Sequence, residues 1–586
     1  MPAKTEFVTL PPTLESFGVA IDFLSRFAPF STTPLGPFAR AVRRQILRGE
    51  HVVAWNGDEL LGYAGWLPTT KGAAEAWLDG GGALLAADAN ADAVALTTVA
   101  VDDPKLVLGL IRASRDLNQG LRVFFKRSYA EEDKPARKSA VHNAASAPQS
   151  APRPAGAARP PIASDPCGFL FGIAGSAPGA TQRIPVGDAS VVVVQSPEVA
   201  ARILVGNGAN YAKNFSSFTP LFGASRLTLD GDAWRRSQRL SQPFIAPHDV
   251  PRAEAIVVDR YADFADRLLE AAGGGVAVDS IVDRAAIDTL VALAFSTEAA
   301  VLGDGFPADL RTVIRFCASR AFDLPGVPAA GVDAGAAERA AGRIRAAVQG
   351  LVQRRRSDPA APPDALGALI DAADRLAHAP VDEQVDLAGE IVTLIVAGSD
   401  TTSAAIGWAM SILAEHPGFQ EQLRGEVAAA TGGRKPGLDD IEKVPSLKPF
   451  IDETLRMFPP VPILSRLAVA ADELDGHAVL PDDRVLVSVI GLHQNPAAWD
   501  APREFRLDRH EGADRSRPDR RSVYLPFSAG PRICGGARFA HMEMALALML
   551  VLQRCRLDLP APLPLAFEWG ASMRRRGGQV IRVTPL

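Results

Sequence analysis

Cysteine is scarce in this chain, and its scarcity excludes two common ways of stabilising a protein. The 586 residues include only four cysteines, Cys167, Cys317, Cys534 and Cys555, and none of them belongs to a Cys-x-x-Cys pair. A long chain with so few, widely separated cysteines is typical neither of a disulfide scaffold nor of a zinc site. We therefore expect a protein of a reducing cytoplasm.

A long apolar amino-terminal run and an excess of basic charge are also missing. The segment MPAKTEFVTLPPTLESFGVAIDFLSRF is interrupted by Glu15, Asp22 and Arg26, so it predicts neither a signal peptide nor a membrane anchor. The formal net charge is −5, which gives no electrostatic basis for binding nucleic acid. We expect a cytoplasmic protein without a membrane anchor and without a nucleic-acid partner.

Large apolar residues are nearly absent from residues 130–165, which are rich in Ala, Pro and Ser. A segment of this composition cannot bury a core, and it predicts a linker. The chain is also too long for one ordinary core. We therefore expect a small domain at residues 1–129 and a large domain at residues 166–586.

The large domain is expected to be mainly helical, with small β-sheets. Residues Ala189–Gln195 form a strand-like run, and residues 381–415 lack proline and carry the apolar pattern of one long core helix. Short β-rich runs return between Ile463 and Ile490, separated by turn residues. A helix is expected to resume near Ala537.

The strongest functional signal is the segment Phe527-Ser-Ala-Gly-Pro-Arg-Ile-Cys-Gly-Gly536. Gly530 permits a turn that residues with a side chain resist. Cys534 stands just before a predicted helix, where backbone N–H groups and the helix dipole favour a thiolate. An isolated cysteine in a glycine-rich turn is more often a buried structural residue, but the whole pattern favours a functional one.

This segment resembles the haem-binding signature F-x-x-G-x-R-x-C-x-G of the cytochrome P450 family at every fixed position. The resemblance implies haem b (iron protoporphyrin IX) with Cys534 as the axial thiolate ligand of the iron, a ligand that favours cleavage of the O–O bond. It also implies that Arg532 binds a haem propionate. Gly536 would let the chain approach the porphyrin, and Phe527 and Gly530 would complete the cofactor-binding loop.

A second segment, Ala397-Gly-Ser-Asp-Thr-Thr402, lies in the expected core helix and resembles the distal helix of the same family. Small residues at positions 397 and 398 would leave room over the haem for dioxygen. Monooxygenation requires proton delivery, and an adjacent acid and alcohol, Asp400 and Thr401, suit a catalytic proton relay. Taken alone, the segment would be read as a helix kink without a chemical role.

Further residues match the family in consistent order over about 420 residues. Trp234 and Arg466 stand where relatives contact the haem propionates. Gln238 is assigned to the same site, although relatives carry a basic residue there. Either Arg239 or Arg466 must then supply the missing charge.

Glu453 and Arg456 form an E-x-x-R motif, which is weak evidence by itself because Glu421 and Arg424 show the same spacing. Its place in the sequence, together with Arg509, resembles the buried Glu–Arg–Arg network of the family. We assign these three residues a structural role.

In the small domain, residues 51–66 predict a hairpin around Asn56-Gly57. The segment Ala76-Trp-Leu-Asp79 follows, and then a strand–helix–strand order over Ala93–Val101, Lys105–Leu117 and Arg122–Lys126. This order resembles the toxin-activating lysine acyltransferases, a branch of the Gcn5-related fold that takes fatty acyl groups from acyl carrier protein.

The catalytic residues of that acyltransferase family are not expected here. Gly36 stands where the family has its histidine, and Thr97 stands near the place of its aspartate. His51 and Asp102 remain as candidates, but a single histidine at the start of a strand is usually structural. We expect a non-catalytic α/β domain of the Gcn5-related type.

Together these resemblances imply a mainly α cytochrome P450 fold with small β-sheets, preceded by a small α/β domain. The implied activity is a haem-thiolate monooxygenase that inserts one oxygen atom from O2 into an apolar substrate. Electrons would come from a ferredoxin or flavodoxin with its reductase, and the substrate is either free or bound to acyl carrier protein. Alternatives are a haem-based sensor and a peroxide-using P450; the intact Asp400-Thr401 pair argues against the latter.

Overall fold

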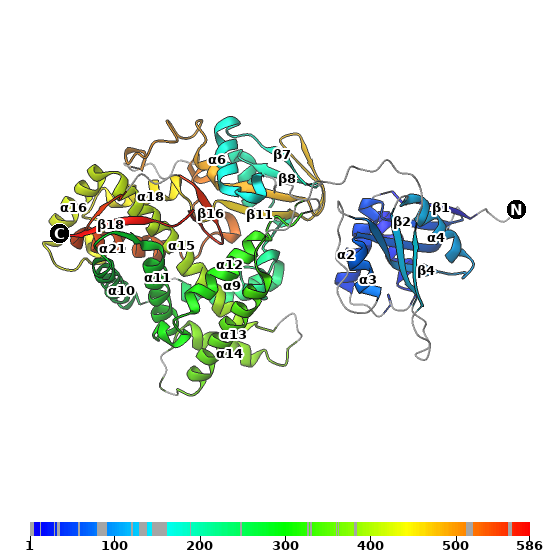
Figure 1. Cartoon of the computed structure of the whole chain (residues 1–586), viewed down its shortest axis with the longest axis horizontal. Helices are drawn as coiled ribbons and strands as arrows, with labels where there is room; N and C mark the ends of the chain where they lie inside the picture. Colours follow the sequence, from blue (N-terminus) through cyan, green and yellow to red (C-terminus); the bar gives the residue numbers. More distant parts are fainter. Residues whose placement is uncertain are drawn as a thin grey trace. The chain divides into compact units, whose positions relative to one another are not determined.

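The structure is a computed structural model, and it describes two compact units (Figure 1). The smaller unit comprises residues 1–158, and the larger comprises most of residues 159–586. The described residues are 5–586 with the exception of 12, 28–29, 32–34, 57–58, 79–90, 119–120, 128–136, 143–160, 188, 246–248, 325–326, 328–330, 359, 361–362, 380–383, 511–519 and 561–564.

The smaller unit is built on a six-stranded sheet in the order β1-β2-β3-β4-β5-β6. Neighbouring strands are antiparallel except β4 and β5, which are parallel and joined through helix α4 (Leu106–Leu117). The strands are β1 (Glu6–Val8), β2 (His51–Trp55), β3 (Leu60–Thr69), β4 (Ala93–Val101), β5 (Arg122–Arg127) and β6 (Arg137–His142).

Both faces of this sheet are covered, because alternate residues of a strand point to opposite faces. Val53 of β2 packs in a cluster with residues of α1 (Leu14–Leu24) and α2 (Leu35–Arg48). Its neighbours Val52 and Ala54 pack in a second cluster with Leu110 of α4. A fourth helix, α3 (Lys71–Leu78), contributes to a smaller cluster.

Part of the expected linker is structured. Strand β6 lies inside residues 130–165 and pairs with β5, so that β6 forms the edge of the sheet. A short helix, α5 (Pro161–Ser164), also lies inside this range. The remaining residues of the expected linker, apart from Asp165, lie outside the described part of the chain.

The larger unit is mainly helical. Its longer helices are α6 (Pro166–Ser176), α9 (Gly231–Ile245), α10 (Val250–Glu270), α11 (Val278–Phe295), α12 (Phe306–Ser319), α13 (Ala334–Arg356), α14 (Ala365–Arg375), α15 (Leu387–Glu415), α16 (Pro417–Thr431), α18 (Leu447–Met457) and α21 (Ala537–Arg554). Short helices are α7 (Pro197–Ala201), α8 (Thr219–Phe222), α17 (Leu438–Ile441), α19 (Val489–His493) and α20 (Arg520–Val523).

Small sheets complete the larger unit. The largest has the order β7-β8-β14-β11-β9, and it lies far from α13 and α14 in Figure 1. Its strands are β7 (Gln182–Val186), β8 (Ala189–Val194), β9 (Tyr211–Lys213), β11 (Ile463–Ala468) and β14 (Arg484–Ser488). The others are β10 (Gly275–Ala277) with β18 (Val580–Pro585) and β15 (Cys555–Asp558), and the hairpins β12 (Asp472–Leu474) with β13 (His477–Val479) and β16 (Phe567–Trp569) with β17 (Met573–Arg575).

Helix α15 is the central element of this unit, and it packs against α11, α21 and α14. It begins later than residue 381, because Asp386 caps its first turn by accepting a hydrogen bond from the N–H of Gly389 (2.9 Å). By length and composition α15 is apolar enough to cross a membrane, yet 72% of its apolar window is buried within the protein. Burial of this extent is typical of a core helix.

Candidate active site

The loop that carries Cys534 is shaped by a glycine in the left-handed region. Gly530 has φ of +70°, and a Cβ atom at this position would overlap the carbonyl oxygen of Leu204. The loop closes with a hydrogen bond from the N–H of Cys534 to the carbonyl of Phe527 (2.9 Å), and Gly536 then caps α21. Cys534 is exposed, whereas the other three cysteines are buried. The fold therefore presents one thiol to accessible space.

The protein by itself does not favour a thiolate at Cys534, contrary to the expectation from its place before a helix. Protein atoms crowd the sulfur on its protected sides, and this desolvation raises the pKa of the thiol above its ordinary value. The N–H of Gly536 and the guanidinium of Arg226 oppose the shift without reversing it. A metal ion deprotonates a thiol that coordinates it, so the thiolate form would depend on the bound metal.

Four cations gather near this loop. Arg532 stacks on the ring of Trp234 (3.9 Å to the ring centre) and donates to Asp230 Oδ1 (2.5 Å). Arg466 is only 5% exposed and faces Lys213 across the β11–β9 pair. Burial and repulsion by Arg466, Arg532 and Arg226 lower the pKa of Lys213 to about 7.

This cation cluster fits a ligand with two carboxylates. Among the described residues, two carboxylates lie within the cluster of Lys213, Arg226, Arg466 and Arg532. Asp230 binds Arg532, and Glu390 accepts a hydrogen bond from the N–H of Arg226 (3.0 Å). Burial raises the pKa of Glu390 to about 7, so its charge is only partial at neutral pH. The excess of buried positive charge matches the two propionates of haem.

Burial favours Arg466 over Arg239 as the cation that accompanies Gln238. Gln238 is half-buried on α9, and Arg239 on the same helix is exposed, whereas Arg466 belongs to the cation cluster. Lys213 was not predicted from the sequence. It joins the cluster through the register of β9 with β11, a long-range pairing that no local motif reveals.

The middle of α15 carries an exposed residue. Ala397 is exposed although it stands in a core helix, and Thr401, one turn further on, is half-buried. This agrees with the expected room at position 397. At position 398, a Cβ would lie 2.6 Å from the end of the Leu290 side chain, so the small residue also lets α15 and α11 pack closely.

Asp400 and Thr401 do not face one another. The hydroxyl of Thr401 donates to the carbonyl of Ala397 (2.9 Å), the i−4 bond that polar side chains often make inside helices. The carboxylate of Asp400 instead accepts a hydrogen bond from Arg574 on β17 (Oδ1 to Nη2, 2.9 Å). A proton relay between the two residues therefore needs intervening groups.

The Glu–Arg–Arg network is buried, as expected. Both side chains of the Glu453–Arg456 pair are 0% exposed, and two hydrogen bonds of 2.7 Å join them. Arg509 approaches Oε1 of Glu453 at 3.2 Å, and His510, which the sequence did not single out, binds Oε2 at 2.8 Å. Hydrogen bonds from Arg456 and His510 outweigh burial and lower the pKa of Glu453. These contacts brace α18 and leave no free donor for chemistry.

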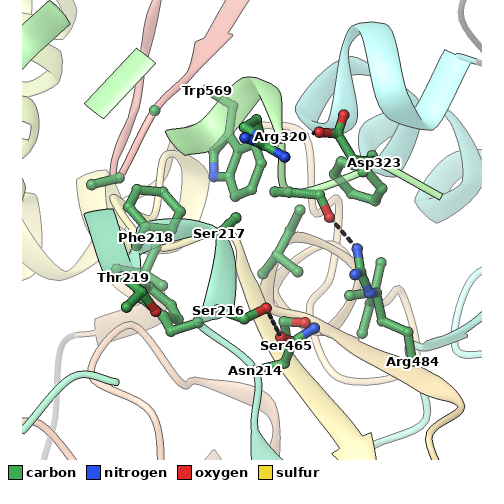
Figure 2. Close-up of a pocket in the computed structure, with 18 of the residues that line it drawn as sticks. Asn214, Ser216, Ser217, Phe218, Thr219, Arg320, Asp323, Ser465, Arg484 and Trp569 are labelled. Carbon is green, nitrogen blue, oxygen red and sulfur yellow. Dashed lines mark hydrogen bonds and ion pairs between the residues drawn. The ribbon is translucent and has the colours of Figure 1, made fainter. Parts of the chain in front are cut away.

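A pocket of about 560 Å³ lies beside strands β11 and β14 (Figure 2). Asn214 and Ser465, the chain neighbours of Lys213 and Arg466, line it. Its wall is largely apolar, a property of sites that bind small organic molecules. The other large side chains that line it are Phe215, Phe218, Phe322, Ile463, Leu486, Trp569, Arg320 and Arg484.

In the smaller unit, the residues considered for acyl transfer do not form a catalytic pair. His51 is fully buried, its Nδ1 lies 2.9 Å from the carbonyl of Gln45, and its Nε2 accepts the N–H of Leu10 (3.0 Å). Thr97 receives a hydrogen bond from Gln45 (3.0 Å), and Asp102 directly follows β4, where its N–H donates to the carbonyl of Leu61 in β3 (3.0 Å). Gly36 lies in α2. Both nitrogens of His51 are thus engaged by backbone, which supports its structural role.

Comparison with known proteins adds to this geometry. A family model described as Cytochrome P450 matches residues 175–582. Cytochrome P450 4F11 of Homo sapiens is 39% identical over 166 residues, which are 27% of this chain and 31% of that protein. Cytochrome P450 4A2 of Rattus norvegicus is 28% identical over 395 residues, which are 63% of this chain and 76% of that protein.

Among solved structures, the crystal structure of the cytochrome P450DA heme domain superposes with a TM-score of 0.62. The alignment covers 71% of this chain and 92% of that chain at 21% sequence identity, a level that shows a common fold. The chain spans about a third of the length of the curated relatives that it matches over a short region, and 31% of Cytochrome P450 4F11.

Proposed function

The chain belongs to the cytochrome P450 family, and from this premise we propose that its larger unit binds haem b and acts as a monooxygenase. The reaction inserts one oxygen atom from O2 into an apolar organic substrate. The observation that carries the proposal is the exposed thiol of Cys534, held by the Gly530 turn beside the cluster of Lys213, Arg226, Arg466 and Arg532.

The residues of this chain have separate roles in the proposed reaction. Cys534 binds the iron. Arg466 and Lys213 bind the propionates, together with Arg532, which stacks on Trp234. When bound, haem with a thiolate ligand supplies the activation of dioxygen. Thr401 and Asp400 hold and pass protons. The largely apolar pocket binds the substrate and excludes water from it.

Electrons are proposed to come from separate partners, a ferredoxin or flavodoxin with its reductase. Among the residues that the structure describes, no group of three or more His, Cys, Asp or Glu side chains is arranged to hold a metal ion. Four free cysteines support a location in a reducing cytoplasm.

Turnover tests this function against its two alternatives. We expect product from a panel of fatty acids, terpenes and aromatics when NAD(P)H and surrogate redox partners are present, preceded by a substrate-induced shift of the haem spectrum. Product with peroxide alone would indicate a peroxide-using enzyme. Spectral binding without product under either condition would indicate a haem-based sensor.

For the smaller unit, we propose a non-catalytic relative of the toxin-activating acyltransferases that recruits acyl carrier protein. The parallel β4–α4–β5 step and the hairpin of β2 and β3 support the resemblance. The engagement of both nitrogens of His51 supports the loss of catalysis. The substrate would then be an acyl or aminoacyl chain presented on its carrier.

A further inference from the structure

The pocket beside β11 and β14 is lined by a half-buried cation without an ionic partner, Arg484 (Figure 2). Within the described part of the chain Arg484 forms no ion pair, and its one hydrogen bond runs from Nη1 to the carbonyl of Ala321. Its Nε is buried and has no hydrogen-bond partner among the described residues. Burial lowers the pKa of Arg484, but a guanidinium stays protonated in proteins. A charge that is partly removed from water is costly to leave unpaired.

The described lining of the pocket carries two arginines and one carboxylate. The carboxylate, Asp323, is bound by Arg320, whose Nε lies 3.0 Å from Oδ2, and both side chains of this pair are exposed. Asp323 makes no hydrogen bond to Arg484 and acts on it through space. The lining therefore has one positive charge in excess, and that charge belongs to Arg484.

The register of β14 with β11 separates Arg484 from the cation cluster of the proposed haem site. Ser465 pairs with Leu486, and Arg484 lies two residues before Leu486, so these three side chains share one face of the sheet. All three line the pocket. Arg466 pairs with Val485 and points to the opposite face. The charge of Arg484 is therefore directed to the pocket and not to the haem propionates.

The remaining edge of the Arg484 guanidinium suits a carboxylate. Nε and Nη2 lie on the same side of the planar group, and neither donates a hydrogen bond within the described part of the chain. Through an edge of this kind arginine binds a carboxylate with charge-assisted hydrogen bonds. The rest of the wall is largely apolar and includes Phe218, Leu486 and Trp569. One unpaired positive charge in an apolar wall matches a ligand with one acidic group and an apolar body.

We propose that this pocket binds an organic acid with an apolar body, and that Arg484 binds its carboxylate. The proposal rests on the proposed monooxygenase function and names the substrate class of that reaction. Arg484 determines which molecules bind and takes no part in oxygen chemistry. A chain attached to acyl carrier protein through its carboxyl group has lost this charge, so a carrier-bound substrate would need a second acidic group.

Calorimetric titration of the full chain with dodecanoic acid and with dodecan-1-ol at pH 7 tests the site without turnover, because the two ligands differ only in their head groups. We expect the acid to bind roughly tenfold more tightly, the value of a hydrogen bond to a charged group. Arg484→Gln should weaken binding of the acid to the level of the alcohol and leave the alcohol unchanged. Arg183→Gln is the matched control, because Arg183 lies on β7 of the same sheet, binds Asp483 (2.9 Å) and does not line the pocket.

Equal affinities of the wild-type protein for the acid and the alcohol would overturn the proposal without any variant. A wild-type preference for the acid in Arg484→Gln would also overturn it. Should Arg484→Gln fail to fold, Arg484→Met removes the charge but keeps an apolar side chain, and it should show the same loss. Binding of the acid that depends on Arg484, without product from surrogate redox partners, would support the acid site and contradict the monooxygenase function. Product without any preference for the acid would do the reverse.

Discussion

Gly530 shows how one residue type decides whether the cysteine loop can form. Alanine there would combine a left-handed φ, which costs roughly 1–2 kcal/mol, with an overlap on the carbonyl of Leu204. We expect Gly530→Ala to lose haem binding. Its free energy of unfolding should fall by more than the cost of the left-handed backbone alone. Gly476, with φ of +78° and no atom within 4 Å of an added Cβ, provides the control.

Haem content and the free energy of unfolding measure this difference. Gly476→Ala should retain its haem and lose only about 1–2 kcal/mol, the cost of the left-handed backbone. Equal losses in the two variants would show that the contact with Leu204 does not shape the loop.

Thr401 is predicted to act in proton transfer rather than in folding. Thr401→Ala removes a helical hydroxyl that binds the carbonyl four residues earlier, a bond of modest net value. We expect haem and substrate binding to persist while electrons are lost as peroxide. The measurement is product per reducing equivalent, and Thr312→Ala, which removes the same type of i−4 bond on the surface of α12, is the control. If Thr401→Ala forms as much product per reducing equivalent as the wild type, the role of Thr401 is structural.

At the scale of elements, features that depend on nearby residues can be predicted from the sequence, whereas features that depend on the pairing of distant strands cannot. The core helix and the strand–helix–strand order of the smaller unit follow from local periodicity and turn residues, and the cysteine loop is identified by its resemblance to the signature of a family. Lys213 and Arg574 could not be found in this way, because their places depend on the register of β9 with β11 and on the hairpin of β16 and β17. The direction of Asp400 likewise depends on a partner 174 residues away.

His493 links α19 to its neighbours, and its burial makes stability depend on pH. Nδ1 binds the carbonyl of Arg456 (3.0 Å) and Nε2 accepts the N–H of Leu525 (2.9 Å), so the folded protein requires the neutral ring. Burial lowers the pKa of His493 from 6.5 to about 3. Between these values the unfolded chain binds a proton that the folded protein excludes, so stability is lost as the pH falls below 6.5.

Denaturant unfolding between pH 7 and pH 5 checks this sign as a difference between the wild type and His493→Gln, because the buried Glu390, with a pKa of about 7, takes up a proton in the same window with the opposite effect on stability. His493→Gln lowers stability overall, and its deficit in the free energy of unfolding should shrink as the pH falls from 7 to 5. A deficit that does not change over this range would contradict the assignment.

At the scale of the whole molecule, the sequence predicts two domains and the structure forms two compact units. If the smaller unit recruits acyl carrier protein, a chain that starts near Pro161 should oxidise a free substrate as fast as the full chain does. It should oxidise the carrier-bound form of the same substrate more slowly, because the local concentration of carrier is lost. An unchanged rate and affinity for the carrier-bound form would leave the smaller unit with a role in folding or assembly.

The measurement closest to the central claim is the optical spectrum of the reduced carbon monoxide complex. The wild-type protein should give the thiolate-type spectrum, and so should Cys555→Ala, in which a buried cysteine is replaced. Cys534→Ser should lose that spectrum, because a neutral hydroxyl cannot donate comparable charge to iron. A thiolate-type spectrum in Cys534→Ser would contradict the assignment of Cys534 as the axial ligand.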